Sequence, residues 1–284
     1  MILALIIAPV ASAQSVNKIK KMMEKINANL EAMGEDFRLE VVDFLTYKDE
    51  AGQTVYYNNR TKQLGHHWVP GDPRRGGGTN ITWLSDQVDG AATAVSQAGT
   101  QAAMARAMET WDDVNCSSIP LVQLPDFGID WGYVQWIVGG GGIPGWYADI
   151  THAGWFSFFT VFGAGWGNVL GVTFTYVWVS GGEYTDIDNN KKLDVAFREI
   201  YYNNDFTWGI NTDSPIDVET VVLHETGHGL SQGHFGRIFR TEANGMLHFA
   251  PRAVMNAAYS GIQQELTGTD NGGHCSIWAH WPNR

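Results

Sequence analysis

Two different periods of hydrophobic and polar positions follow one another in the first fifth of the chain. Apolar side chains recur every three to four residues between 16 and 33, which predicts an amphipathic helix. Its apolar positions are Val16, Ile19, Met23, Ile26, Leu30 and Met33. Alternating positions in "FRLEVVDFLTY" (37–47) and in the short "TVYYN" (54–58) then predict two strands around the turn "KDEAGQ".

A stretch dense in glycine and proline, "VPGDPRRGGGTN" (69–80), separates these elements from the rest of the chain. Such a composition is typical of turns and linkers. It predicts a boundary between an N-terminal segment at 14–75, a candidate pro-region, and a main domain at 76–284.

The main domain is predicted to mix helices and strands. A long helix rich in alanine is predicted over 96–114. Strands are predicted in "TNITWLSD", "IPLVQLP", "YADIT" and "NVLGVTFTYVWV", whereas "KLDVAFREIYYN" (192–203) fits a strand or a helix. Residues 150–182 carry no charged side chain, but their repeated glycines favour buried sheet over a membrane-spanning helix.

The clearest signals for the start of a helix precede residues 215–229. Ser214 would cap the N-terminus, Pro215 would take the first helical position, and Asp217 would complete a capping box. The predicted helix runs into "LHETGHGLSQGHFG" (223–236), which holds three of the nine histidines of the chain. This concentration of imidazoles indicates a metal site.

The spacing of these histidines explains why the site would be catalytic. His224 and His228 are four residues apart, so their rings project from one helix face and can bind a single cation, for which zinc is the best match. His234 supplies a third nitrogen, and Glu225 can reach a metal-bound water without being a ligand. Three protein ligands and one open position are the arrangement of a catalytic zinc site.

The segment "HETGHGLSQGH" resembles the metzincin zinc-protease pattern H-E-x-x-H-x-x-G-x-x-H, and its surroundings resemble the matrixin branch of that family. "AMARAMETWDDV" is similar to the first helix of these proteins, "NVLGVTF" (168–174) to their substrate-edge strand, and "AVMNAAYSG" to their Met-turn. The resemblance covers roughly 76–284. It implies an α+β zincin-like fold: a twisted mixed five-stranded sheet, a long first helix, a zinc-binding active-site helix and a C-terminal subdomain with the Met-turn.

The same resemblance implies a secreted endopeptidase that acts on protein or peptide substrates. One zinc ion on the three histidines would lower the pKa of its water toward about 7 and polarise the scissile carbonyl. Glu225 would act as the general base, and the strand at 168–174 would bind the substrate as an added antiparallel strand. Met255 would lie beneath the zinc, and Tyr259 beside the pocket for the substrate residue after the scissile bond.

Three positions depart from the family pattern. Ser231 replaces a glycine of positive φ, which costs about 1 kcal/mol unless the turn is rebuilt on Gly229 or Gly233. Val172 stands where a histidine would hold a structural zinc, so no second zinc is predicted. No cysteine precedes the domain to act as a switch, and Asp72 is either a latch on the zinc or part of a plain turn.

A calcium site is a separate hypothesis, based on "DIDNNKKLD" (186–194). Positions 1, 3, 5 and 9 of an EF-like loop would carry oxygens from Asp186, Asp188, Asn190 and Asp194. The glycine of position 6 is absent, and Phe197 occupies position 12. The segment therefore predicts either a calcium loop of a different type or a polar turn before a strand.

The chain start and the charge bear on compartment and partners. "MILALIIAPVASAQS" has the pattern of a secretory signal cleaved after Ala13, which predicts residues 1–13 as a signal peptide. In an oxidising compartment Cys116 and Cys275 could form a disulfide, with two buried thiols as the alternative. A net charge of −12 without a basic stripe argues against nucleic acid as a partner. No integral membrane span and a monomeric state are expected.

Two rival hypotheses fit the same motif. A zincin of another clan would use Glu242 as its third ligand in place of His234. A secreted binding or adhesion protein would keep the zinc for structure and use the aromatic-rich region for contacts, without proteolytic activity.

Overall fold

The computed structural model describes residues 13–47, 51–213, 215–241, 243 and 245–283. Almost all of the predicted signal peptide, together with Ser214 and Glu242, lies outside these residues. Within them, the predicted helix at 16–33 is confirmed as α1 (Ala13–Met33), and the alanine-rich helix as α3 (Gln97–Asp112).

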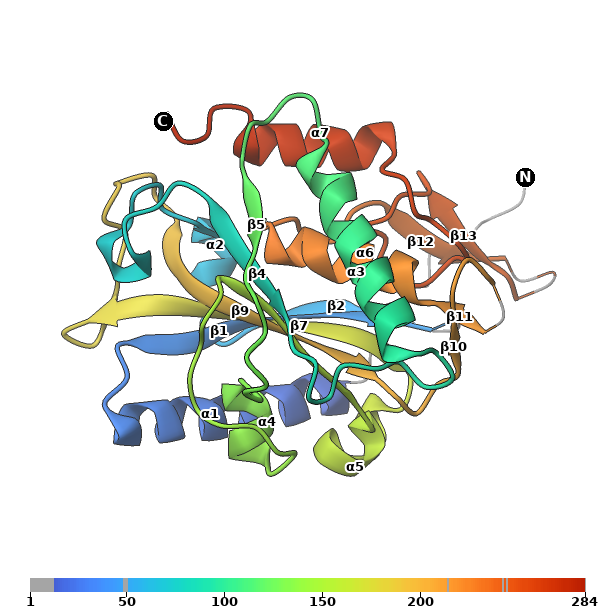
Figure 1. The fold of residues 1–284 in the computed structure, drawn as a ribbon, viewed down its shortest axis with the longest axis horizontal. Coiled ribbons are helices and arrows are strands. Elements are labelled where there is room, and N and C mark those ends of the chain that lie inside the picture. The colour runs from blue at the N-terminus through green and yellow to red at the C-terminus, as the bar shows by residue number, and fades with distance from the viewer. Residues whose placement is uncertain (1–12, 48–50, 214, 242, 244, 284) are drawn as a thin grey trace.

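A nine-stranded mixed sheet forms the centre of the molecule (Figure 1). Its main path has the order β2-β1-β7-β9-β6-β4-β5. The bounds along that path are β2 (Gln53–Tyr56), β1 (Phe37–Thr46), β7 (Val169–Ser180), β9 (Leu193–Asn203), β6 (Ile150–Phe156), β4 (Ile81–Ser85) and β5 (Leu121–Gln123). Two short strands lie off the path: β3 (His66–His67) pairs with β9, and β8 (Glu183–Tyr184) pairs with β7.

Along this path the pairing changes once, from parallel to antiparallel, at β9. The pairs β5–β4, β4–β6 and β6–β9 are parallel, whereas β9–β7, β7–β1 and β1–β2 are antiparallel. The chain is therefore an α+β protein with a mixed sheet, but the sheet is larger than the predicted five strands. The additional strands include β1 and β2, which come from the N-terminal segment.

The segment 192–203, which the pattern left open between strand and helix, is the strand β9, and all eleven of its residues are buried. A strand covered on both faces loses its alternation because both sets of side chains are in a core. The charge-free stretch 150–182 contains β6 and β7, joined by the short helices α5 (Phe158–Phe162) and η2 (Ala164–Trp166). Among the described residues, no helix has the length and apolar character needed to cross a membrane.

Helices cover both faces of the sheet (Figure 1). On one face lie α1, α4 (Tyr133–Val138) and α5, and on the other lie α3 and α6 (Val218–Gly229), with α7 (Gly268–Trp278) beyond them. A separate hydrophobic core fills each side. Ile19, Met23 and Ile26 of α1 pack into the first core with Phe174 and Phe197 of the sheet.

The N-terminal segment is part of the same sheet as the main domain. β1 pairs with β7 along its whole length, from Phe37 opposite Trp178 to Thr46 opposite Val169. The domain division predicted at 69–80 stays a prediction, but strands from both sides of it share one sheet.

At that boundary, Asp72 caps the 3-10 turn η1 (Pro73–Arg75) and forms a 2.7 Å ion pair with Arg74. It therefore belongs to a plain turn.

The helix α6 begins three residues later than predicted. Its N-cap is Asp217, whose carboxylate accepts a 2.9 Å hydrogen bond from the Thr220 backbone N–H. The preceding residues Ile216–Asp217 form the strand β11, which pairs with β10 (Trp208–Gly209). Pairing with β10 keeps the backbone extended up to Asp217, so the capping role moves to that residue.

The remaining elements are α2 (Thr61–Leu64), β12 (Arg237–Arg240) and β13 (Leu247–Ala250). β12 and β13 form a two-stranded sheet after the histidine motif. A disulfide joins Cys116, which follows α3, to Cys275 in α7.

Candidate metal centre

Three imidazole rings converge at the C-terminal end of α6. Nε2 of His228 lies 3.1 Å from Nε2 of His224 and 3.1 Å from Nε2 of His234. His224 and His228 are buried and His234 is half-buried. The structure therefore brings together the three residues that the sequence analysis selected as metal ligands.

The other ring nitrogens of His224 and His228 show that the Nε2 atoms of these two rings are not hydrogen-bonded to each other. Nδ1 of His224 lies 2.7 Å from the Val254 carbonyl oxygen, and Nδ1 of His228 lies 2.8 Å from that of Gln232. Because a carbonyl only accepts, each Nδ1 carries the ring hydrogen, and each Nε2 of a neutral ring presents a lone pair. Two lone pairs at 3.1 Å repel each other unless a cation lies between them.

The geometry matches the donor set of a zinc site. Tetrahedral zinc with bonds of about 2.0–2.1 Å separates its nitrogen ligands by about 3.3 Å. Burial lowers the pKa of His224 to about 4 and the pKa values of His228 and His234 well below their ordinary value. The rings are therefore neutral near pH 7, which is the form that binds metal.

The turn between the second and third histidines is made by Ser231 itself, with a φ of +66°. Neither Gly229 nor Gly233 takes over this conformation, because neither has a positive φ. The Ser231 hydroxyl accepts a 3.0 Å hydrogen bond from Nη2 of Arg198. The serine thus adopts the backbone conformation of the glycine it replaces and gains a side-chain partner.

The end of α6 is fixed by donors from distant parts of the chain. The Gly229 carbonyl accepts hydrogen bonds from Nη1 of Arg198 and from Nε1 of Trp68, and the Leu230 carbonyl accepts one from Nε1 of Trp278. Sequence reasoning missed Arg198 and Trp68. A single arginine inside the apolar run "LDVAFREIYY" was the available signal, because a buried guanidinium must find acceptors.

Met255 lies under the metal helix. A Cβ atom at Gly227 would collide with the Met255 sulfur, so the two residues are in close contact. The Met255 carbonyl accepts a 2.8 Å hydrogen bond from the N–H of Phe235, the residue after His234, and its own N–H donates to Asp270. Together with the contact between His224 and Val254, these bonds tie the segment around Met255 to two of the three histidines.

Glu225 is fully buried on the side of α6 that faces the sheet. Its Oε2 accepts a 2.7 Å hydrogen bond from the Thr173 hydroxyl in β7, while Oε1 has no hydrogen-bond partner among the described residues. Burial raises the pKa of this carboxyl group well above its ordinary value, and hydrogen bonds from Thr173 and from the Leu45 backbone oppose the rise. A Cβ at Gly171 would lie 2.7 Å from Oε1, so glycine leaves room for the carboxyl group.

Tyr259 lies in the Met-turn segment, four residues after Met255, and it is buried. Its hydroxyl accepts a 3.1 Å hydrogen bond from the Asp217 N–H, and burial raises the pKa of this phenol to about 12. Its ring lies 6.2 Å from that of Tyr47, which belongs to the N-terminal segment. The predicted pocket beside Tyr259 is therefore in contact with residues that precede the main domain.

The candidate calcium loop brings Asp186, Asp188 and Asp194 together, with one oxygen of each within 4.8 Å of the others. Other groups already use these oxygens. Asp194 accepts a 2.9 Å ion pair from Arg74, and the Asn190 amide donates to Asp188. The Arg74 guanidinium therefore already balances part of the negative charge of the loop. Calcium at this loop stays a prediction.

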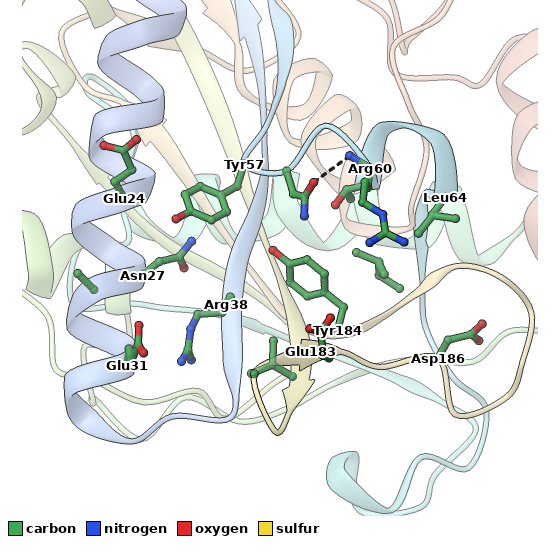
Figure 2. Close-up of a pocket in the computed structure, with 16 residues that line it drawn as sticks. Glu24, Asn27, Glu31, Arg38, Tyr57, Arg60, Leu64, Glu183, Tyr184 and Asp186 are labelled. Carbon is green, nitrogen blue, oxygen red and sulfur yellow. Dashed lines mark hydrogen bonds between the residues drawn. The ribbon is translucent and has the colours of Figure 1, made fainter.

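A hollow of about 650 Å³ lies away from the histidines. It is bounded by α1, by residues 57–64 and by the turn around Glu183, and charged side chains line much of it (Figure 2). Asp186 is the single predicted site residue on its wall. The hollow therefore does not belong to the candidate metal centre.

No known family model matches this chain, and no curated protein matches it either. The assignment of a function therefore depends on the geometry of the site and on the motif it contains.

Proposed function

We propose that this protein is a secreted zinc-dependent endopeptidase with a metzincin-like catalytic domain. One observation carries the proposal: the Nε2 atoms of three histidines converge on one place, while Nδ1 of His224 and of His228 is held by a backbone carbonyl. Contacts between Nδ1 and a backbone carbonyl fix the tautomer and the orientation of a metal-binding imidazole.

The topology supports the same proposal. The path β5-β4-β6-β9-β7 is a mixed five-stranded array with one antiparallel strand at its end, as the resemblance implies. α3 and α6 cover one face of it, and the segment around Met255 packs under α6. The zincin-like fold and the matrixin-like branch are therefore part of the proposal.

The three histidines would bind the zinc, and Glu225 would act as the general base and then as the general acid. When bound, zinc supplies a Lewis acid and a water of lowered pKa in a site with one open position. Glu225 follows His224 directly on the same helix, and it would accept the proton of the attacking water and donate it to the leaving amine. Thr173 orients this carboxyl group through its 2.7 Å hydrogen bond.

The alternative function is a secreted zinc-containing binding or adhesion protein. The full burial of Glu225 favours it, because a general base must reach water and substrate. The two functions differ in one measurable property, the hydrolysis of peptide bonds.

The test uses the purified mature protein. We expect one zinc per chain by elemental analysis, and casein or gelatin cleavage that a chelator abolishes and added zinc restores. Glu225→Gln should keep the zinc and lose activity by a factor of about 10² to 10⁴. A zinc-loaded wild type that cleaves neither protein under any condition would favour the binding function, and a chain that takes up no zinc would contradict both.

A further inference from the structure

The end of β1 lies between two segments of the main domain. On one side it pairs antiparallel with β7, with Phe44 opposite Val172 and Leu45 opposite Gly171. On the other side Thr46 forms a parallel bridge with Ala258, which lies between Met255 and Tyr259 in the Met-turn segment. Asp43 and Phe44 lie between β7 and β2, whereas the end of β1 around Thr46 lies between the predicted substrate-edge strand and the predicted pocket wall.

Backbone hydrogen bonds hold this end on both sides. The Thr46 carbonyl accepts a 2.8 Å hydrogen bond from the Tyr259 N–H, and the Tyr47 N–H donates a 2.9 Å bond to the Asn168 carbonyl. The Thr46 hydroxyl donates to the Ala257 carbonyl at 3.3 Å. An extended peptide that adds to a sheet edge uses backbone groups of this kind.

The same residues contact the candidate catalytic groups. The Leu45 backbone lies beside the carboxyl group of Glu225, and the Leu45 side chain is 2% exposed within the core that contains α6. Oδ1 of Asp43 lies 3.9 Å from Nδ1 of His228. Val42 and Phe44 pack into the core on the opposite face, so the alternation along β1 places Asp43 and Leu45 on the α6 side.

We propose that residues 43–47 are a built-in substitute for the peptide substrate, and that this form of the protein is closed. The proposal rests on the proposed function. In this proposal the end of β1 occupies the position of a substrate strand. A strand in that position is antiparallel to β7 and parallel to the segment at 257–259. Peptide binds and is hydrolysed only in molecules in which residues 43–47 have left this place.

The anchoring of β1 limits the part that moves. Phe37 and Leu39 are buried in the core between α1 and the sheet, where the Phe37 ring lies 4.9 Å from that of Phe197. Removing the whole segment would expose that core, whereas displacement of residues 43–47 withdraws only Phe44 from it. Displacement also breaks the pairing of Asp43 and Phe44 with β2 and the hydrogen bond from the Thr54 hydroxyl to Asp43. The full burial of Glu225 is then a property of the closed form.

A reversible disulfide between positions 46 and 258 tests the proposal on the full-length chain, and we call the variant that carries it the lock. Thr46 and Ala258 are bridge partners, and adjacent strands lie about 5 Å apart, within the Cα separation that a disulfide spans. The variant carries Thr46→Cys and Ala258→Cys. The matched control carries Arg38→Cys and Val177→Cys, a pair that joins β1 to β7 at the far end of the strand. Wild type receives the same oxidant and reductant, which controls for effects on the native disulfide.

Two readouts are compared on zinc-loaded protein: binding of a fluorescent peptide of sequence FRLEVVDFLTY, copied from residues 37–47, and casein cleavage. We expect oxidation of the lock to weaken both by at least tenfold, and reduction to restore both. Oxidation of the control should change neither. Peptide binding and cleavage that are equal in the oxidised and reduced lock would overturn the proposal.

The peptide readout separates this inference from the proposed function. If the reduced lock binds the peptide, the oxidised lock does not, and neither cleaves casein, the strand replacement stands and the protease function fails. If the reduced lock binds no peptide although it carries zinc, residues 43–47 do not leave the groove, and the inference is wrong.

Discussion

The buried guanidinium of Arg198 donates a 3.0 Å hydrogen bond to the hydroxyl of Ser231, across the turn that joins the second and third histidines. Arg198 comes from β9 in the middle of the sheet, and the same side chain donates to the Gly229 carbonyl at the end of α6. A glycine at position 231 would relieve the strain of the positive φ but would remove one of the two side-chain contacts of Nη2, the other being His66. The serine is therefore a structural part of the turn.

This hydrogen bond predicts that two substitutions at position 231 lower the stability of the protein by different amounts. Ser231→Ala keeps the unfavourable φ of +66° and loses the hydrogen bond to a charged donor, so we expect a stability loss of about 1.5–3 kcal/mol. Ser231→Gly loses the same bond but relieves the backbone, so its loss should be smaller by about 1 kcal/mol. Urea unfolding measures both. Equal losses would show that the positive φ carries no strain.

Gly171 determines whether Glu225 can keep its position. A Cβ there would lie 2.7 Å from both Cγ and Oε1 of Glu225, so Gly171→Ala must displace the carboxyl group. We expect casein cleavage to fall at least tenfold while zinc content stays at one per chain. Gly167→Ala is the matched control, because its φ is not positive and the nearest atom to its Cβ is 4.0 Å away. Full activity in Gly171→Ala would separate Glu225 from the reaction.

The third ligand can be identified by metal affinity. His234→Ala removes one of three converging nitrogens, and we expect zinc affinity to fall by about 100-fold or more, since even outer-shell substitutions cost about 10–100-fold. His248→Ala in β13 is the control, because that ring stacks on Phe239 and is not part of the histidine cluster. Competition with a zinc-binding dye gives the affinity. Wild-type zinc binding by His234→Ala would favour Glu242 as the ligand.

A buried carboxyl group outside the metal centre predicts a pH dependence of stability. Glu199 accepts hydrogen bonds from the Val134 N–H at 3.0 Å and the Tyr201 hydroxyl at 3.0 Å, and burial raises its pKa from 4.5 to about 7. Between these values the folded state holds a proton that the unfolded state has released. The contribution of Glu199 to the free energy of unfolding should therefore fall as pH rises through this window, by about 1.4 kcal/mol per pH unit.

Glu199→Gln provides the comparison for that slope. The variant has no proton to release, so the difference between its unfolding free energy and that of the wild type should change between pH 4.5 and 7 and level off above pH 7. Urea unfolding across this range measures the difference. A constant difference across the window would place the folded pKa of Glu199 near its ordinary value.

Much of the candidate site was predictable because it is local. His224, Glu225 and His228 share one helix, and their spacing alone places two imidazoles on one face. The long helices and most strands also follow from patterns over ten to twenty residues. The contacts that hold the site in place were not predictable in this way, since the Arg198 and Trp68 donors to the Gly229 carbonyl are 31 and 161 residues away.

The sequence by itself determined the periodic elements, the identity of the three imidazoles and the chemistry that those residue types favour. Tertiary structure alone decided that 192–203 is a strand, that Asp217 caps α6, and that Ser231 makes the turn. It also decided that β1 pairs with β7. The physical reason is range: helical spacing and alternation are fixed by neighbouring dihedral angles, whereas strand pairing and burial depend on which distant surfaces meet.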